Sequence, residues 1–165
     1  TDSLPAIALG LEPHSDAVMQ EKPRPRSEGI LTKPFLLSVG TEGLVIALAT
    51  ILAFHIGLAS GGAAVASTMA FATLTLARLF HGFTCRSERG SLRHLGLRSN
   101  RYSLAAFAAG LCLLAAVLLI PALHGLFVIA DLTAANFLEI LGLAFAPTAV
   151  MQLLRLVREA KGREI

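Results

Sequence analysis

The sequence has few charged residues and few cysteines, and these shortages exclude several classes of protein. Only 15% of the 165 residues are charged, whereas 55% are hydrophobic and the mean hydropathy is +0.69. A soluble domain of this length carries about 25% charged residues, so the composition indicates a protein of the lipid bilayer. Cys85 and Cys112 are too few and too far apart for a disulfide framework or a CxxC site. Thiol redox chemistry is therefore not indicated.

Motifs for binding metals, nucleotides and nucleic acids are also missing. The five histidines never occur three or four residues apart, so no zinc site is indicated. The sequence contains neither a D-K-T-G phosphorylation motif nor a G-x-x-x-x-G-K-[ST] phosphate loop. The net charge is +3, but the basic residues are spread between apolar stretches, so we expect no nucleic-acid partner. The chain opens with Thr1 and shows no signal peptide, and we expect a fragment or a processed chain.

Four apolar stretches have the length of about 20 residues that a helix needs to cross a bilayer. They are residues 35–59, 63–83, 102–123 and 132–154. We therefore predict an all-α integral membrane helical bundle. The glycine-rich stretch Gly57–Gly62 predicts a tight turn, so the first two helices form an antiparallel hairpin. Pro121 and Pro147 fall inside the third and fourth stretches and are compatible with membrane helices, with a kink expected at Pro147.

Two further kinds of segment flank these spans. Residues 1–10 have the composition of the end of a fifth membrane helix, with a break expected at Pro5. Residues 11–34 are rich in proline and charge, which is typical of an exposed cytoplasmic loop. Residues 35–157 then form the four-helix transmembrane domain, and residues 158–165 a cytoplasmic tail.

The basic residues give the orientation of the bundle. Thirteen of the 14 lysine and arginine residues lie before the first span, between the second and third, or after the fourth, and only Arg78 lies within a span. The positive-inside rule then places these segments and both termini in the cytoplasm. The preference for arginine over lysine and the short loops favour a bacterial plasma membrane.

Three sequence segments resemble one family of ion pumps. Residues 1–13 read TDSLPAIALGLEP, residues 67–74 read STMAFATL and residues 79–88 read LFHGFTCRSE. They are similar to the C-terminal transmembrane region of calcium-type P-type cation-transporting ATPases, from the end of helix six to helix ten. Ser3 stands where the family pattern T-D-G-x-P-A-x-A-L-G has its glycine.

The resemblance implies a fold and a function. The four spans would be helices seven to ten of a ten-helix pump, and Thr1 and Asp2 would be the last residues of the cation site on helix six. Asp2 would be a direct metal ligand, which suits a hard divalent cation that prefers carboxylate and carbonyl oxygens. The parent would use ATP, magnesium and a transported divalent cation, with calcium expected. The partners of this chain would be the remaining helices, the cytoplasmic domains of the pump and membrane lipid. We expect no ATP hydrolysis from this chain alone.

Arg78 suggests how many cations move in each cycle. Family members that bind two calcium ions carry a glutamate at the aligned position, and a guanidinium there predicts one cation per cycle. Ser67, Thr75, Arg78 and His81 project along one side of a helix and predict a buried polar stripe. The alternative is that the Arg78 side chain extends along the helix to reach the cytoplasmic membrane interface.

Two acids and several small residues within the spans have simpler interpretations. Glu42 and Glu139 each lie near a membrane boundary, so solvation at the interface is expected for both. Gly40, Gly43 and Ala47 have the spacing of a surface that packs closely against a neighbouring helix.

Two other functions remain open from the sequence. The chain could be an independent small membrane scaffold or regulatory protein that derives from such a pump and transports nothing itself. A small multidrug-type exporter is a third interpretation, although such proteins rely on an acid in the centre of a span. The acids here lie at the ends of the spans.

Overall fold

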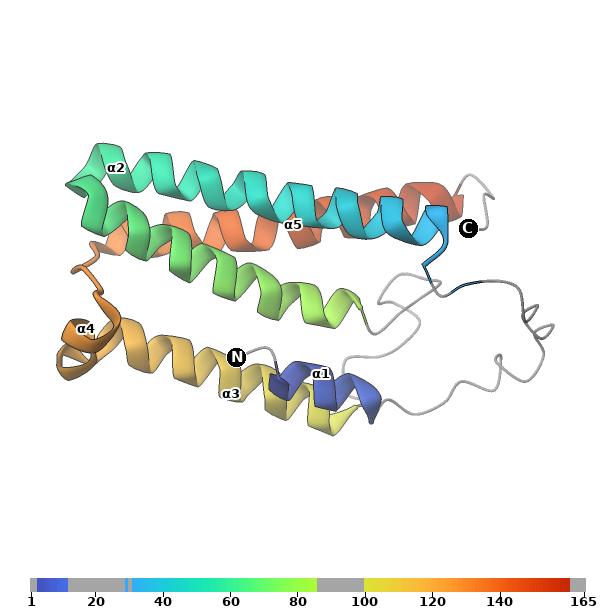
Figure 1. The fold of residues 1–165 in the computed structure, drawn as a ribbon, viewed down its shortest axis with the longest axis horizontal. Coiled ribbons are helices and arrows are strands. Elements are labelled where there is room, and N and C mark those ends of the chain that lie inside the picture. The colour runs from blue at the N-terminus through green and yellow to red at the C-terminus, as the bar shows by residue number, and fades with distance from the viewer. Residues whose placement is uncertain (1–2, 12–28, 30, 86–99, 161–165) are drawn as a thin grey trace.

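Helices form nearly all of the regular structure in this computed structural model, which describes residues 3–11, 29, 31–85 and 100–160. The helices are α1 (Ser3–Gly10), α2 (Lys33–Thr84), α3 (Arg101–Leu119), α4 (Pro121–Phe127) and α5 (Ala134–Ala160). The described residues contain no strand. The predicted all-α class is confirmed (Figure 1).

Helix α2 is a hairpin of two long limbs. The backbone leaves helical geometry at Gly61 (φ −159°, ψ 17°) and at Gly62 (φ 77°, ψ −167°), and glycine adopts the positive φ of Gly62 without steric cost. We call residues 33–60 the first limb and residues 63–84 the second limb. At Gly57 the limbs are so close that an added Cβ would lie 2.6 Å from the Cα of Ala66. The glycine-rich turn expected from the sequence is therefore present, and the two limbs lie side by side (Figure 1).

The other helices pack around this hairpin. Helix α5 lies along both limbs of α2, α3 lies against the second limb, and α1 lies on α3 (Figure 1). The ring of Phe80 on the second limb joins three of these helices, since its centroid is 5.8 Å from that of Phe107 on α3 and 5.6 Å from that of Phe145 on α5. The buried core around this contact consists of Met69, Ala72, Leu76, Ala77, Leu79, Leu114, Ile140 and Ala144.

Close helix contacts occur at other glycines than those expected. A Cβ added at Gly110 on α3 would lie 2.6 Å from Cδ2 of Leu79, so α3 approaches the second limb at this point. A Cβ added at Gly40 or Gly43 would meet nothing within 4 Å among the described residues, and Ala47 is exposed. The small residues of the first limb therefore do not pack against a helix in the described part of this chain, and their packing against a neighbouring helix stays a prediction.

The prolines affect the helices in different ways. The third apolar stretch is divided, because α3 ends at Leu119 and Ile120 is extended (φ −93°, ψ 108°) before Pro121 opens α4. A residue before proline avoids helical geometry, and proline is favoured in the first turn of a helix. Helix α1 continues through Pro5, so the expected break there is wrong; Pro5 falls in the first turn of α1, where an N–H has no partner within the helix. Helix α5 also continues through Pro147.

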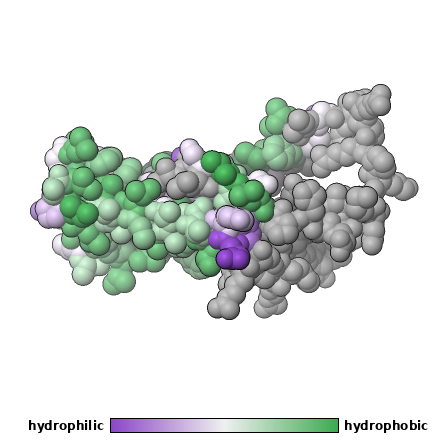
Figure 2. Space-filling model, turned by 90° about the horizontal axis from the view of Figure 1, so that it is seen from below, coloured by the Kyte–Doolittle hydropathy of each residue, from purple (hydrophilic) through white to green (hydrophobic). Residues whose placement is uncertain are grey.

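Three helices are long and apolar enough to cross a membrane. They are Phe35–Gly82, which contains both limbs of the hairpin, Arg101–Leu119 and Ala134–Val157. In the apolar 18-residue stretch of each of these helices, only 17% to 22% is buried inside the chain. Hydrophobic side chains cover most of the described face in Figure 2. Such large exposed apolar surfaces are stable only against lipid or against further helices.

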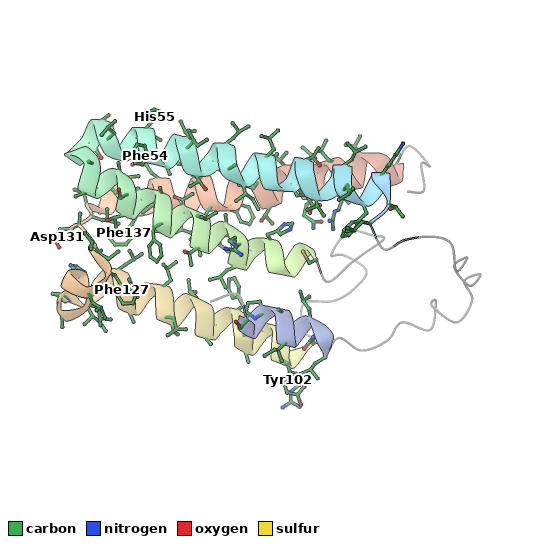
Figure 3. The ribbon with its side chains drawn as sticks, in the orientation of Figure 1. Phe54, His55, Tyr102, Phe127, Asp131 and Phe137 are labelled. Carbon is green, nitrogen blue, oxygen red and sulfur yellow. The ribbon has the colours of Figure 1, made fainter. Side chains whose placement is uncertain are left out.

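The two ends of the bundle differ in character. The turn of α2, helix α4 and Asp131 lie at one end, and the labelled Tyr102 lies at the other, where it points away from the helices (Figure 3). Tyr102 is 63% exposed, and tyrosine is enriched where membrane helices meet the interface. The start of α2, the start of α3 and the end of α5 share the Tyr102 end (Figure 1), and the basic residues Lys33, Arg101 and Arg155 belong to these parts of the helices.

Candidate functional site

The expected cation ligands stand just before the first helix. Thr1 and Asp2 lie outside the described residues, and α1 begins at the next residue, Ser3. The structure therefore describes the helix that directly follows the expected ligands, and the contacts that hold this helix in place.

Asn100 connects α1 to α3 through both ends of its side-chain amide. It is the N-cap of α3, where its Oδ1 accepts a hydrogen bond of 3.0 Å from the backbone N–H of Ser103. Its Nδ2 donates a 2.8 Å hydrogen bond to the backbone carbonyl of Ala8 on α1. Asn100 is 2% exposed and Ala8 is 3% exposed, so the junction is buried and its polar atoms are paired.

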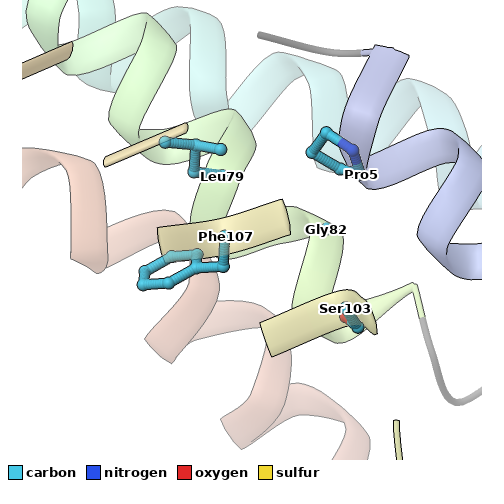
Figure 4. A pocket seen from close by; sticks show the side chains of 5 residues that line it. All are labelled: Pro5, Leu79, Gly82, Ser103 and Phe107. Atoms are coloured by element: carbon cyan, nitrogen blue, oxygen red, sulfur yellow. The ribbon is translucent and has the colours of Figure 1, made fainter. Parts of the chain in front are cut away.

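A small crevice lies beside this junction, between α1, α2 and α3. It is lined by Pro5, Leu79, Gly82, Ser103 and Phe107 (Figure 4). Its volume of about 10 Å³ holds no more than about one water molecule. Ser103 is the one lining residue with a polar side chain, and the second limb and α3 contact α1 at this crevice.

The expected polar stripe is divided between exposed and half-buried positions. Ser67 and Arg78 are exposed in this chain, whereas Thr75 and His81 are half-buried. Arg78 directly precedes Leu79, which belongs to the buried core. Within the described residues the structure does not gather these four side chains into one enclosed site.

Glu42 forms a polar cluster that the sequence did not predict. It is 9% exposed; its Oε1 lies 3.1 Å from an Nη of Arg155 and its Oε2 lies 3.3 Å from Nε2 of His81. The carboxylate thus joins the first limb, the second limb and α5. The expectation that Glu42 is solvated at the interface was wrong, because two partners from distant parts of the chain enclose it.

Cys85 adjoins this cluster at the end of the second limb. Its Sγ lies 3.4 Å from Nε2 of His81, one helical turn away, and the cysteine is exposed. Among residues 3–11, 29, 31–85 and 100–160, no group of three or more His, Cys, Asp and Glu side chains has the geometry to hold a metal ion. The Glu42 cluster is a contact between helices.

A second network holds the opposite end of α5. Asn136 accepts hydrogen bonds at Oδ1 from the N–H (3.0 Å) and the hydroxyl (2.7 Å) of Thr133, and the N–H of Asn136 donates to Oγ1 of Thr133 (3.3 Å). This reciprocal pairing is a capping box with asparagine at the third helical position. The Nδ2 of Asn136 also donates to Ser60 (3.3 Å) and to Glu139 (3.4 Å). Glu139 is half-buried and has a partner in this network.

The loop between α4 and α5 is attached to the hairpin at the same end. The N–H of Ala130 donates to Oγ1 of Thr68 (3.0 Å), and Thr68 is 1% exposed. His124 lies 3.5 Å from Asp131 through Nδ1 and 3.1 Å from the Leu118 carbonyl through Nε2. These contacts fix the loop against the second limb and against the end of α3.

Some buried polar atoms have no hydrogen-bond partner within the described residues. They are Oγ1 of Thr73, Oγ1 of Thr148 and Nε2 of Gln152. In a bilayer such atoms find no bulk water, so they are places where a bound water or a neighbouring helix can pair.

The arrangement of the described residues braces the helices against one another. Three polar junctions fasten the bundle: the Asn100 junction at α1, the Glu42 cluster at the same end, and the Asn136 network at the other end. All three join segments that are far apart in the sequence. The sequence signal that could have suggested the Glu42 cluster is the presence of Arg155 on the same side of the membrane.

Comparison with known proteins gives a consistent result. Residues 1–157 match the family described as cation transporting ATPase, C-terminus. A calcium-transporting ATPase of Bacillus subtilis is 35% identical over 153 residues, which is 92% of this chain and 17% of that protein. A calcium-transporting ATPase of Listeria monocytogenes is 34% identical over 159 residues, or 95% of this chain and 18% of that protein. The human calcium-transporting ATPase type 2C member 1 is 27% identical over 161 residues, 97% of this chain and 18% of that protein.

These relatives are much longer than the sequence described. The chain spans less than a fifth of the length of each of these three relatives. The family match and the long apolar helices make it a multi-pass membrane protein.

Proposed function

Because the chain belongs to the cation-transporting ATPase C-terminal family, we propose that it is the C-terminal membrane region of a P-type pump that moves calcium. The observation that carries the proposal is the match over residues 1–157, together with bacterial relatives of 34% to 35% identity that are named calcium-transporting ATPases. In this function α2, α3 and α5 form a scaffold, and the residues before α1 bind the transported ion.

The scaffold supports ion binding by holding α1. Asp2 supplies a carboxylate to the cation and Thr1 stands beside it. Hard divalent cations such as calcium take oxygen ligands from carboxylates and carbonyls. The contacts of α1 with α3 and with the second limb of α2 support this role, because they fix the helix that follows Asp2.

Arg78 sets the number of ions moved in each cycle to one. Its fixed positive charge stands on the second limb, at the exposed edge of this chain. That exposed position allows helices that this sequence does not contain to pack against it. A guanidinium at such a place disfavours a second cation nearby through charge repulsion.

The rest of the pump supplies the chemistry. Cytoplasmic domains bind ATP and magnesium, and the remaining membrane helices cover the exposed apolar surface together with lipid. The basic ends of the helices lie on the cytoplasmic side of a bacterial plasma membrane, in line with the positive-inside rule.

The test is ATP-dependent uptake of labelled calcium by inverted vesicles that contain the full-length parent. Asp2→Asn removes the ligand charge, and we expect loss of uptake. Asp131→Asn is the matched control, because the Asp131 side chain is 99% exposed at the opposite end of the bundle. If Asp2→Asn transports calcium as well as the unmodified protein, the proposed ligand is wrong.

The ion count has its own test in the same vesicles. Arg78→Glu exchanges the positive charge for a carboxylate, and we expect more calcium transported for each ATP hydrolysed. Arg78→Gln removes the charge without adding a ligand, and we expect an unchanged ratio. An unchanged ratio in Arg78→Glu would rule out the proposed role of Arg78.

A further inference from the structure

We propose that Asn100 is a positioning residue for ion binding: its side-chain amide fixes the end of α1 to the start of α3 and thereby sets the place of Asp2. This inference rests on the function proposed above. It concerns a residue that does not touch the ion and acts through α1.

The geometry uses every part of the Asn100 amide. The backbone of Asn100 is extended (φ −117°, ψ 101°), as an N-cap requires. The carbonyl oxygen Oδ1 accepts from Ser103 N at 3.0 Å and the amide nitrogen Nδ2 donates to Ala8 O at 2.8 Å. Because Asn100 is 2% exposed, water cannot readily replace either bond.

The acceptor on α1 is a carbonyl that the helix itself leaves unpaired. Helix α1 ends at Gly10, so the Ala8 carbonyl is one of the last four carbonyls of the helix. These carbonyls accept no hydrogen bond from an N–H group within the helix. It accepts from Leu11 N at 3.2 Å and from Asn100 Nδ2 at 2.8 Å. Both lone pairs of this oxygen are thus used: one accepts the local bond from Leu11, and the other accepts the bond from Asn100 at the start of α3.

The identity of the residue points to the second bond. Aspartate and serine cap a helix about as well as asparagine, but neither has an amide N–H with which to reach a neighbouring helix. The capping role needs only an oxygen acceptor and therefore does not by itself require asparagine. The donation to Ala8 does.

The link to the ion follows from the rigidity of a short helix. Ala8 lies five residues after Ser3, which is about 7.5 Å of helix at 1.5 Å per residue, and Asp2 directly precedes Ser3. A shift at the Ala8 end of α1 also moves the Ser3 end, because the hydrogen-bonded turns of α1 move as one unit, and we expect Asp2, the preceding residue in the sequence, to move with it. Misplacement of a ligand by about 1 Å is enough to weaken a preorganised site.

The expected effect of losing the bond is a weaker affinity for calcium with little change in the maximal rate. An interaction that places a binding group acts on the bound state, so its loss raises the concentration for half-maximal uptake. For one buried hydrogen bond we expect a rise of about three- to tenfold.

The experiment compares variants of the full-length parent in inverted vesicles, with uptake measured over a range of calcium concentrations. Asn100→Asp and Asn100→Ser keep the cap on Ser103 N and lose the amide donor to Ala8. Asn136→Asp is the matched control, because it likewise keeps the capping acceptor and loses the amide donor, but at the far end of α5. The amount of each variant in the membrane is measured by immunoblot.

The outcomes separate a positioning role from a structural one. A raised half-maximal calcium concentration in both Asn100 variants, at a near-normal maximal rate and with Asn136→Asp unchanged, supports the inference. Unchanged calcium dependence in the Asn100 variants overturns it, as does absence of both variants from the membrane, which would make Asn100 a folding residue. If the unmodified protein takes up no calcium, or Asp2→Asn pumps normally, the proposed function fails and the positioning role fails with it.

Discussion

The carboxylate of Glu42 lies 3.1 Å from the guanidinium of Arg155, across 113 residues of sequence. His81 approaches the other oxygen of the same carboxylate at 3.3 Å. One acid thereby joins the first limb of α2, the second limb and α5 at the basic end of the bundle. Because a charge in a low-dielectric region is stable only when it is paired, these three segments are held in one register there.

Replacing Glu42 by glutamine should destabilise the bundle. The change leaves Arg155 without its carboxylate, and removing one partner of a fully buried pair costs about 3 to 5 kcal/mol. The Arg155 side chain is 21% exposed, so partial solvation reduces the expected cost to about 1 to 3 kcal/mol. The measurement is the midpoint of thermal unfolding of the purified full-length protein in detergent. Unfolding is monitored as the loss of the monodisperse peak in gel filtration after heating.

Two comparisons make this first prediction specific. Glu139→Gln changes a half-buried acid at the other end of α5 and should lower the midpoint less. Glu42→Gln combined with Arg155→Gln should cost less than the sum of the single changes, because the residues are coupled. Equal midpoints for Glu42→Gln and Glu139→Gln, or simple additivity, would contradict the pairing.

Replacing Gly57 by alanine should force the two limbs of α2 apart. The new Cβ would lie 2.6 Å from the Cα of Ala66 and 3.0 Å from its backbone nitrogen, and backbone atoms cannot rotate away as a side chain can. Overpacking of this kind costs about 1 to 3 kcal/mol. We expect a lower thermal midpoint of the full-length protein. Gly142→Ala is the control, since a Cβ at Gly142 meets nothing within 4 Å, and alanine there should be neutral or stabilising in a helix. Similar midpoints for the two variants would rule out the tight crossing.

Much of the fold follows from the sequence, because membrane helices have a clear physical signature. Apolar length and the distribution of basic residues indicated the helical bundle, and the glycines before Ala63 indicated the hairpin. The break at Ile120 could also have been predicted, since a residue before proline avoids helical geometry. The sequence did not indicate which side of each helix faces another helix, because lipid and protein neighbours select the same apolar side chains. Gly40 was therefore expected to pack, whereas the close contacts within the described residues include those at Gly57 and Gly110.

The partners in the polar junctions were not predicted from the sequence for a different reason. Asn100 and Ala8 are 92 positions apart, and Glu42 and Arg155 are 113 apart. No local sequence pattern indicates such partners, and a charged residue near a membrane boundary is solvated unless a distant part of the chain supplies a partner. Thr1 and Asp2 were assigned from family resemblance alone. They lie outside the described residues, so that assignment remains a prediction.

Replacing Val128 by glycine should stabilise the protein. Val128 ends α4 in the left-handed region (φ 54°, ψ 45°), which costs about 1 to 2 kcal/mol for a residue with a Cβ. It is 80% exposed, so little packing is lost. The greater freedom of glycine in the unfolded chain offsets part of the gain, which leaves about 0.5 to 1 kcal/mol and a slightly higher thermal midpoint. Leu126→Gly, inside α4, should lower the midpoint instead. A lower midpoint for Val128→Gly would mean that the side chain has a contact outside this chain.

The capping box at the start of α5 can be tested with one pair of variants at Thr133. Thr133 is exposed, so its contribution comes from the hydroxyl that accepts from Asn136 N and donates to Asn136 Oδ1, and not from packing. Thr133→Ala removes the hydroxyl and should cost about 1 kcal/mol, the usual loss for a helix cap. Thr133→Ser keeps the hydroxyl and should leave the thermal midpoint of the full-length protein nearly unchanged. If alanine and serine lower the midpoint equally, the methyl group of Thr133 is what matters, and the cap makes no measurable contribution to the stability of α5.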